Sequence, residues 1–413
     1  MIKVEKLIPG GQALGTLPDG KKIFLWNALP GESVEEYDVT KQKPRYTEAI
    51  ATKIKKPSPH RVEPEDDCYL STSPWQILDY DYELKQKQAL VVEMFREHHI
   101  DIRIPKIFTN GQDYHYRNKM EYALYWNNDT EKIDLAFHAR GSHRKIPITK
   151  SSIERPEIFK TATEIVTMLN NNHAEARNYQ SLLLRCNKKG DVSGGLYEKH
   201  KPHAIFNNLT DTILGEKYSY SPNGFFQINL PVYEIALKEI KKYITTDKIL
   251  DLYSGVGTIG LSVARDKNLT LVECDKNAFS ELLKNCAEGV FEGGPEAGKP
   301  RGSAKTPVAT GVLDAPRKNF PQTVLAKSED VTNYIEPDMT VILDPPRAGC
   351  DKKLISKLLE ITPEKIIYLS CNPMTQARDV KLLLAKYIID DIKTFNFFPH
   401  TPHIENLLIL SRR

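Results

Sequence analysis

The sequence lacks close cysteine pairs, long apolar runs and a strong net charge. Its 413 residues include six cysteines, Cys68, Cys186, Cys274, Cys286, Cys350 and Cys371. Their wide spacing argues against a disulfide framework and against a cysteine-based zinc site, and it favours a reducing compartment. No stretch approaches the roughly 18 apolar residues of a membrane span, and residues 1–6 lack the features of a signal peptide. We therefore expect a soluble cytoplasmic protein.

The net charge of +3 gives little reason to expect a nucleic-acid partner from overall charge. A local basic stretch does occur between residues 103 and 145. Its cationic side chains are Arg103, Lys106, Arg117, Lys119, Arg140, His143, Arg144 and Lys145, interleaved with Tyr114, Tyr116, Tyr122, Tyr125 and Trp126. Such a mixture can neutralise phosphates and stack unpaired bases, although a solvated basic face over an aromatic core is the alternative.

Three regions are predicted, because the chain is longer than one ordinary domain. Residues 1–58 show short β-branched and aromatic runs between turns, which predicts a small β-barrel followed by a basic linker at 53–61. Residues 59–225 mix strands with helices over 81–99 and 157–170, which indicates an α+β middle domain. We expect the first of these helices to pack on the third region.

Residues 226–413 alternate between helices and strands, which predicts a doubly wound parallel α/β sheet of the Rossmann-like kind. Helices are expected over 231–243, 258–265 and 277–287. Strands are expected over 248–252, 269–273, 322–326, 340–343, 365–369, 391–398 and 406–410. The stretch 289–316 is rich in Gly, Pro, Ala, Lys and Ser and has no periodicity, so it is expected to form a flexible surface insertion.

Three predicted strands end in polar motifs. They are Asp-Leu-Tyr-Ser-Gly-Val-Gly at 251–257, Asp-Pro-Pro-Arg at 344–347 and Ser-Cys-Asn-Pro at 370–373. Ligands of an open α/β sheet bind beyond the carboxyl ends of the strands. We therefore expect the three motifs to meet at one pocket.

The glycine-rich loop at 251–260 predicts a cofactor site, because its glycines let a ligand approach the backbone and the following helix offers unpaired N–H groups. Glu273, at the end of the next strand, can accept hydrogen bonds from both hydroxyls of a ribose, which NAD and S-adenosylmethionine (SAM) share. Asp251 can face the cationic amino group of SAM, and no partner for a pyrophosphate is obvious. These features favour SAM, and a glycine-rich turn without a ligand is the alternative.

Cys371 is the candidate nucleophile. It follows a strand end and precedes the rigid Asn372-Pro373 turn, which would keep the thiol out of the core. A lone cysteine is more often an inert apolar residue, and that interpretation is adopted for Cys274, Cys286 and Cys350. Glu405 supplies a carboxylate just before the last strand. A thiol and a carboxylate in one SAM pocket suggest covalent catalysis with proton abstraction.

Five segments, in this order along the chain, closely resemble the RNA 5-methyluridine methyltransferases. They are Gly-Phe-Phe-Gln-Ile-Asn at 224–229, the motifs at 251–257, 344–347 and 370–373, and Phe-Pro-His-Thr-Pro-His-Ile-Glu at 398–405. Residues 1–58, with Ala-Leu-Pro-Gly-Glu at 28–32, are similar to the TRAM domain of that family. The resemblance covers almost the whole chain.

The resemblance implies a function and a set of roles. The chain would methylate C5 of a uridine in RNA, with Cys371 attacking C6 of the uracil and Glu405 removing the C5 proton. The residues that match the family's SAM contacts are Gln227, Tyr253, Glu273 and Asp344. Arg347 is expected near the uracil or its flanking phosphates. Because the uracil must leave any stack to be reached, a loop or a flipped base is the expected target.

One departure from the family concerns iron. Many members hold an iron–sulfur cluster on four cysteines of the middle domain, and such a cluster requires four thiolates. The corresponding stretch here, 68–76, has only Cys68, and 148–153 has no cysteine. We therefore predict that the chain has neither an iron–sulfur cluster nor another bound metal.

Two other functions are weighed against this one. The first is an RNA-binding or RNA-folding module whose chemistry is dispensable. The second is a nicotinamide-dependent oxidoreductase built on the same glycine-rich loop, which would leave Cys371 and Glu405 without a role. The leading prediction is a SAM-dependent RNA uracil-C5 methyltransferase that acts as a monomer on transfer RNA or 23S ribosomal RNA.

Overall fold

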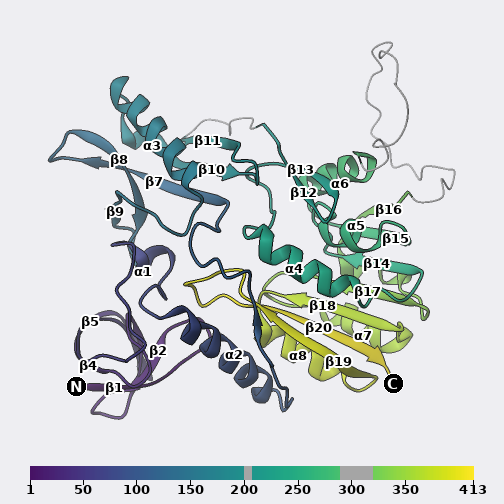
Figure 1. Cartoon of the computed structure of the whole chain (residues 1–413). Helices are drawn as coiled ribbons and strands as arrows, with labels where there is room; N and C mark the ends of the chain where they lie inside the picture. Colours follow the sequence, from purple (N-terminus) through teal and green to yellow (C-terminus); the bar gives the residue numbers. More distant parts are fainter. Residues whose placement is uncertain (200–206, 289–319) are drawn as a thin grey trace.

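The computed structural model describes residues 1–199, 207–288 and 320–413, and it shows three regions packed together (Figure 1). A purple barrel lies at the lower left, a mixed sheet lies above it, and a large sheet flanked by helices lies at the right. The predicted flexible insertion at 289–316 lies outside the described residues. Within the described ranges, no helix is long and apolar enough to cross a membrane.

The N-terminal region is a closed barrel with the strand order β1-β2-β3-β5-β4, so the predicted β-barrel is confirmed. Its strands are β1 (Ile2–Leu7), β2 (Ala13–Thr16), β3 (Lys22–Trp26), β4 (Ser33–Gln42) and β5 (Tyr46–Lys56). Alternate side chains such as Ile23 and Leu25 are fully buried, because successive residues of a strand face opposite sides. Arg61 of the basic linker is fixed by the buried Glu32, which accepts from its Nε at 2.6 Å and its Nη2 at 2.9 Å.

The middle region has a five-stranded sheet with the order β11-β10-β7-β8-β9, and α3 covers one face of it. The sheet strands are β7 (Lys119–Asn127), β8 (Lys132–His138), β9 (Lys145–Pro147), β10 (Tyr179–Cys186) and β11 (Val192–Glu198). The other elements are α1 (Tyr69–Thr72), α2 (Tyr80–Glu97), α3 (Pro156–Asn171), η1 (Ala176–Asn178), and the hairpin of β12 (Leu209–Ile213) and β13 (Glu216–Tyr220). Helix α2 is capped by Asp79, which accepts a hydrogen bond from the Tyr82 N–H at 2.9 Å.

The C-terminal region is built on an eight-stranded sheet with the order β16-β15-β14-β17-β18-β20-β19-β6. Its strands are β6 (Ile107–Phe108), β14 (Lys248–Leu252), β15 (Asn268–Glu273), β16 (Gln322–Leu325), β17 (Met339–Leu343), β18 (Lys365–Ser370), β19 (Tyr387–Phe395) and β20 (Glu405–Arg412). Its helices are α4 (Leu230–Lys241), α5 (Thr258–Ala264), α6 (Lys276–Glu288), η2 (Ser328–Asp330), η3 (Thr332–Tyr334), α7 (Lys352–Ile361) and α8 (Pro373–Leu383).

The prediction of an all-parallel sheet is wrong for the last strands. The strands from β16 to β18 are parallel, but β20 runs antiparallel to both β18 and β19. The physical reason is the short link between β19 and β20, because a parallel pair needs a crossover of roughly a dozen or more residues. The two-residue strand β6 of the middle region adds to the edge of this sheet beside β19.

Both faces of the large sheet are apolar, which explains the continuous apolar runs of its strands. Val341 and Leu343 belong to one core cluster, whereas Ile342 between them belongs to another. The first cluster also contains barrel residues and the buried face of α2, and α2 packs against α8. The helix predicted at 81–99 therefore does pack on the C-terminal region.

Candidate active site

The carboxyl ends of four parallel strands lie at one edge of the large sheet. In the strand register, Leu252 pairs with both Val272 and Leu343, and Leu343 pairs with Tyr368. The residues that follow these strand ends therefore emerge side by side. The motifs at 251–257, 344–347 and 370–373 meet at this edge, as the sequence predicts.

Glu273 closes the glycine-rich loop. Its Oε2 accepts a hydrogen bond from the Gly255 N–H at 2.8 Å, and its Oε1 accepts from the N–H groups of Cys274 and Asp275 at 2.7 and 2.6 Å. Oε1 is thereby filled, whereas Oε2 keeps lone-pair capacity for a further donor, such as a hydroxyl. Gly255 has φ +57°, and a Cβ built there would have no atom within 4 Å. Open space therefore adjoins the loop backbone beside Glu273.

Asp251 is buried beneath the same loop. Its Oδ2 accepts a hydrogen bond from the Gly260 N–H at 2.8 Å, while Oδ1 is buried without a hydrogen-bond partner. Burial, reinforced by the negative charges of Asp344 and Glu273, raises the pKa of Asp251 to about 8. The carboxyl group thus ties β14 to α5. The free acceptor site of Glu273 Oε2 and the open backbone at Gly255 suit a ligand that carries ribose hydroxyls, and SAM carries them.

The other predicted cofactor residues are Tyr253, Asp344 and Gln227. Tyr253 has φ +64°, a strained conformation for a residue with a side chain, and burial raises its pKa. Burial also raises the pKa of Asp344, to about 7. Gln227 is nearly buried, and its carbonyl oxygen accepts a hydrogen bond from Asn118 Nδ2 at 3.0 Å. The middle region thus fixes the backbone at Gln227.

Arg185 is a second anchor of the same segment and is not among the predicted site residues. It is 1% exposed, and its Nη1 and Nη2 donate to the carbonyl oxygens of Gly224 and Phe226 at 3.1 and 2.7 Å. Its guanidinium carbon lies 5.4 Å from the ring centre of Tyr220, which stacks on Phe226. The available sequence signal is an arginine that directly follows the apolar run Leu-Leu-Leu at 182–184.

Cys371 and Glu405 emerge from neighbouring strands. Ser370 of β18 pairs with Asn406 of β20, so Cys371 and Glu405 occupy the next opposed positions of this antiparallel pair. Cβ atoms at directly opposed positions lie about 4.5–5.5 Å apart. The Cys371 side chain is half-buried, whereas that of Glu405 is 4% exposed. The thiol and the carboxyl group predicted from the sequence are therefore neighbours.

Burial governs the acidity of both groups. Burial raises the pKa of Cys371 to about 11, and the nearby Glu405 and Asp344 carboxyls add to this shift. Burial also raises the pKa of Glu405 well above its usual value, with Asp344 again contributing. The positive charge of Arg347 opposes both shifts. The pair is thus a weakly acidic thiol beside an unusually basic carboxylate.

Arg347 connects the two motifs that flank the thiol. Its carbonyl oxygen accepts hydrogen bonds from Asn372 Nδ2 at 2.9 Å and from Thr375 Oγ1 at 3.1 Å. Its guanidinium Nη2 lies 3.5 Å from His403 Nδ1, two residues before Glu405. The exposed guanidinium group is near enough to Cys371 and Glu405 for its positive charge to act on the pKa of each.

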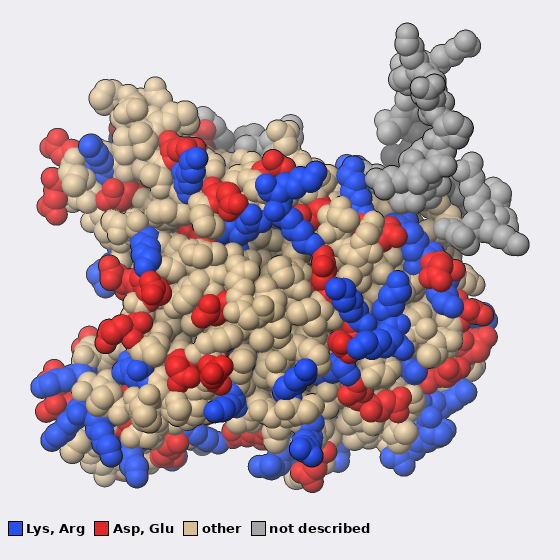
Figure 2. All heavy atoms as spheres, viewed as in Figure 1, with Lys and Arg blue, Asp and Glu red and all other residues tan. Residues whose placement is uncertain are grey.

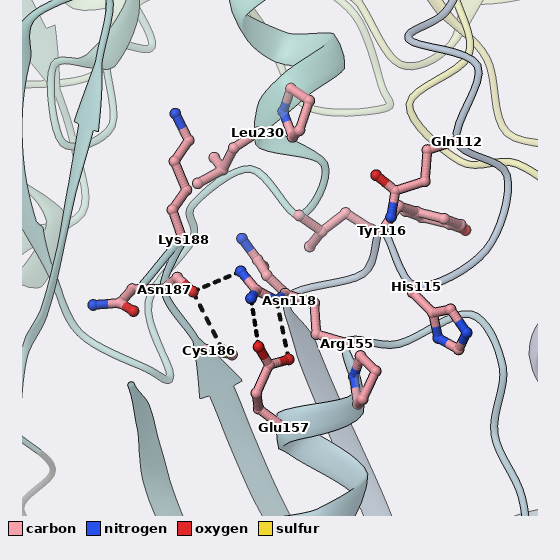
Figure 3. Close-up of a pocket in the computed structure, with 13 residues that line it drawn as sticks. Gln112, His115, Tyr116, Asn118, Arg155, Glu157, Cys186, Asn187, Lys188 and Leu230 are labelled. Carbon is pink, nitrogen blue, oxygen red and sulfur yellow. Dashed lines mark hydrogen bonds and ion pairs between the residues drawn. The ribbon is translucent and has the colours of Figure 1, made fainter. Parts of the chain in front are cut away.

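A cavity of about 340 Å³ lies between the middle and C-terminal regions (Figure 3). It adjoins the cofactor segment through Ile228 and Asn118. In Figure 3 the Arg155 guanidinium is bonded to Glu157 and to the carbonyl oxygen of Asn187, at 2.6 and 2.8 Å. Lys188, which also lines the cavity, pairs with Glu234. The charges of its arginine and its lysine are thus already compensated.

Some residues of the predicted RNA-binding surface are buried in the structure. Tyr116 and Tyr122 are 4% and 0% exposed, so they belong to the core and do not offer a stacking surface. Trp126 is 44% exposed, and the Arg140 guanidinium stacks over Trp26 of the barrel at 4.0 Å. On the face drawn in Figure 2, blue and red side chains surround a largely uncharged central surface.

The remaining cysteines differ from one another. Cys286 and Cys350 are buried, as expected of apolar residues. Cys274, just beyond the end of β15, is exposed, so it is not a core residue, but burial and the neighbouring Glu273 raise its pKa. Cys68 is buried, which raises its pKa to about 12. The prediction that the chain binds no iron–sulfur cluster continues to rest on the sequence.

Comparisons with known proteins agree with this geometry. The family model of tRNA (uracil-5-)-methyltransferases matches residues 320–413, which include Cys371 and Glu405. An uncharacterized RNA methyltransferase of Treponema denticola is 29% identical over 445 residues, covering 100% of this chain and 99% of the relative. One from Bacillus cereus is 26% identical over 469 residues, covering 100% and 96%.

A solved structure shares the fold over the whole chain. It is the Pyrococcus abyssi tRNA (uracil-54, C5)-methyltransferase in complex with S-adenosyl-L-homocysteine, with a TM-score of 0.73, 23% identity and coverage of 100% of both chains. The barrel, the middle region and the Rossmann-like region are thus common to both structures. By sequence, the chain is thus similar over its whole length to RNA methyltransferases, and residues 320–413 match the tRNA (uracil-5-)-methyltransferase family.

Proposed function

We propose that the chain methylates C5 of a uridine in an RNA loop through a transient covalent bond between Cys371 and C6 of the uracil. The observation that supports this most is the opposed placement of Cys371 and Glu405 at the sheet edge that also carries the cofactor loop. C5 of uracil is a poor nucleophile until addition at C6 converts the ring into an enolate. A thiol and a base on neighbouring strands supply the groups for addition and elimination.

The addition step uses the Cys371 thiolate. Its sulfur forms a bond to C6, and the electron pair of the C5–C6 double bond moves onto C5 and the adjoining carbonyl group. Bound SAM supplies an electrophilic methyl group for C5. Because the pKa of Cys371 in the free enzyme is about 11, few molecules carry the thiolate at neutral pH. Arg347 favours the thiolate, so its charge contributes to the rate of addition.

The elimination step uses Glu405. The carboxylate takes the proton from C5, the C5–C6 double bond forms again, and the bond between C6 and sulfur breaks so that the thiolate leaves. Burial strengthens the carboxylate as a base, because the pKa of Glu405 lies well above its usual value. We assign Gln227, Tyr253, Glu273 and Asp344 to SAM, with Glu273 on the ribose hydroxyls. The cytoplasmic location, the monomeric state and the boundaries of the three domains stay predictions.

Nucleoside mass spectrometry tests the proposal and identifies the RNA. Transfer and ribosomal RNA would be purified separately from a strain that lacks the gene and from the same strain complemented with the wild-type or the Cys371→Ala gene. We expect 5-methyluridine to disappear from one RNA class and to return only with the wild-type gene. An unchanged 5-methyluridine content in every RNA class would refute the proposed function, and full restoration by Cys371→Ala would refute the covalent mechanism.

A further inference from the structure

The loop that leads into Glu405 is held by residues from outside the C-terminal sheet. This loop, 396–404, joins β19 to β20. The Pro399 carbonyl oxygen accepts from the Tyr116 hydroxyl at 3.0 Å, and the His400 carbonyl oxygen accepts from the backbone N–H of Trp75 at 3.0 Å. Both donors belong to segments of the middle region. The backbone before Glu405 is thus fixed by distant parts of the chain.

Helix α2 contributes a buried ion pair to the same loop. Glu83 and Lys87 lie one turn apart, their side chains are fully buried, and Glu83 Oε1 lies 2.9 Å from Lys87 Nζ. Lys87 Nζ also donates to Asn396 Oδ1 at 2.6 Å and to the Phe398 carbonyl oxygen at 3.0 Å. The ammonium group is therefore bonded to two residues of the loop as well as to its own helix.

Glu83 binds the loop at two further points. Its Oε1 accepts from Asn396 Nδ2 at 3.1 Å, and its Oε2 accepts from the His400 N–H at 2.9 Å. His400 has φ +58° and is 3% exposed, and its ring stacks on Tyr114 at 4.3 Å. The ring nitrogens of His400 lie 3.6 Å from Glu83 Oε2 and 3.4 Å from Asp113 Oδ2. The left-handed turn at His400 is thus held from both sides.

A buried ion pair is a poor way to attach one helix to another. Removing two charges from water offsets most of their attraction, and apolar residues of similar size often stabilise a fold as well or better. Helix α2 already has such residues, because Leu90, Val91 and Phe95 are buried in the core cluster that it shares with α8. The charged pair instead satisfies polar groups of the loop, which buried backbone requires. Its contacts therefore fit loop placement better than helix packing.

We propose that Glu83 and Lys87 are positioning residues for the reaction: through the 396–404 loop they hold Glu405 at the distance from the uracil C5 proton that elimination requires. This inference rests on the proposed function. The elimination step would thus depend on α2, although this helix precedes the C-terminal region by more than a hundred residues. Addition by Cys371 should depend on it much less, because the thiol follows β18 directly and does not belong to the 396–404 loop.

The test is a kinetic comparison of full-length variants, with SAM and RNA extracted from the deletion strain. Glu83→Gln keeps the shape of the side chain and removes its charge, and Glu83→Gln/Lys87→Met removes both charges so that neither is left unpaired. We expect kcat to fall about 10- to 100-fold while KM for RNA and SAM stays within about threefold. A covalent protein–RNA adduct should accumulate on denaturing gels, because elimination slows and addition does not.

A double-mutant cycle separates positioning from general damage. In the Glu405→Gln background, Glu83→Gln should change the rate of adduct breakdown by less than about twofold, because residues that act through one group are not additive. Glu216→Gln is the control for the loss of an ion pair away from the loop, since Glu216 lies 2.7 Å from Arg265. Because these side chains are partly exposed, we expect a smaller loss of Tm than in Glu83→Gln and an unchanged kcat.

Three results would overturn the inference. These are a normal kcat in both Glu83 variants, a loss of activity that matches the loss of folded protein, or an equal effect of Glu83→Gln with and without Glu405. Failure of the proposed function has a different signature. In that case the wild-type enzyme would form no adduct with RNA, or Glu405→Gln would turn over at the normal rate.

Discussion

The two halves of the proposed active site are built in different ways. The cofactor half is local: Asp251, Gly255 and Glu273 belong to one β-α-β unit, and their hydrogen bonds join neighbouring strand ends. The half that carries Glu405 is assembled from afar, because α2 and the segment around Tyr116 hold the 396–404 loop. Cys371 lies where the two halves meet.

This difference indicates which changes should affect which step. A substitution in the local unit should alter SAM binding or the stability of the loop while leaving Glu405 in place. A substitution in the distant contacts should slow elimination while leaving SAM affinity unchanged. Substitutions in each half test whether effects on SAM binding and effects on elimination are separate.

Cys371→Ala removes the thiol that is proposed to attack the uracil. We expect methylation to fall by at least about 1,000-fold, equivalent to about 4 kcal/mol, because C5 is then never converted into a nucleophile. SAM affinity, measured by calorimetry, should stay within about threefold. Cys68→Ala is the matched control, because Cys68 is a buried thiol of the middle region. A comparable loss of activity in the control, or substantial activity in Cys371→Ala, would contradict this assignment.

Two glycines of the cofactor loop should respond in opposite ways to alanine. At Gly257, with φ +89°, a Cβ would lie 2.5 Å from Leu282 Cδ1, so Gly257→Ala should destabilise the fold by about 2–4 kcal/mol. At Gly255 the Cβ would enter open space, so Gly255→Ala should cost about 1 kcal/mol or less. That added methyl group would stand in the proposed SAM site and lower SAM affinity more than about tenfold. Thermal unfolding and calorimetry of both variants test this, and equal effects on stability would contradict it.

Asp251→Asn tests whether burial raises the pKa of Asp251, the carboxyl group beneath the glycine-rich loop. The pKa of Asp251 rises from 3.8 to about 8 on folding, so the folded state favours the protonated form. The carboxyl group therefore lowers the free energy of unfolding as the pH rises from about 4 to about 8. Asn keeps an acceptor for the Gly260 N–H and does not ionise. Between pH 5 and pH 8.5 the wild type should lose about 1–3 kcal/mol more than the variant in urea unfolding, and identical pH profiles would contradict the burial.

Tyr116→Phe removes one contact between the middle region and the 396–404 loop, the hydrogen bond to the Pro399 carbonyl oxygen. A single buried hydrogen bond contributes about 1 kcal/mol, so we expect kcat to fall about two- to fivefold with SAM affinity unchanged. Tyr218→Phe is the control in the cofactor half, where the hydroxyl lies 2.7 Å from Ser262 Oγ. It should cost similar stability without slowing elimination. If Tyr116→Phe changed SAM affinity instead, the separation of the two halves would fail.

The local half could be predicted from the sequence in detail. A strand, a glycine-rich turn and an acid at the next strand end suffice to place Glu273 beside Gly255, because all three lie in one β-α-β unit. The placement of Cys371 and Glu405 at opposed positions of two strands is harder to predict. It depends on β20 running antiparallel between β18 and β19, which alternation of helices and strands does not reveal.

The distant half could not be predicted, because its contacts join residues about 300 positions apart. Glu83 and Lys87 are spaced like an ordinary solvent-exposed pair on a helix. Their burial follows from the packing of α2 against α8 and the loop. Tyr116 and Tyr122 illustrate the converse, since aromatic residues interleaved with basic ones suggested a stacking surface but fill the core. Composition does not specify which face of a strand becomes buried.

The most direct test of the covalent mechanism is to trap the enzyme on RNA that contains 5-fluorouridine. RNA of the class identified by the deletion strain would be transcribed with this base and incubated with the enzyme and SAM. Fluorine at C5 cannot be removed as a proton, so elimination by Glu405 is blocked after addition and methylation. Peptide mass spectrometry should then find one methylated nucleotide attached to Cys371. Attachment at another residue, or no covalent complex at all, would contradict the mechanism.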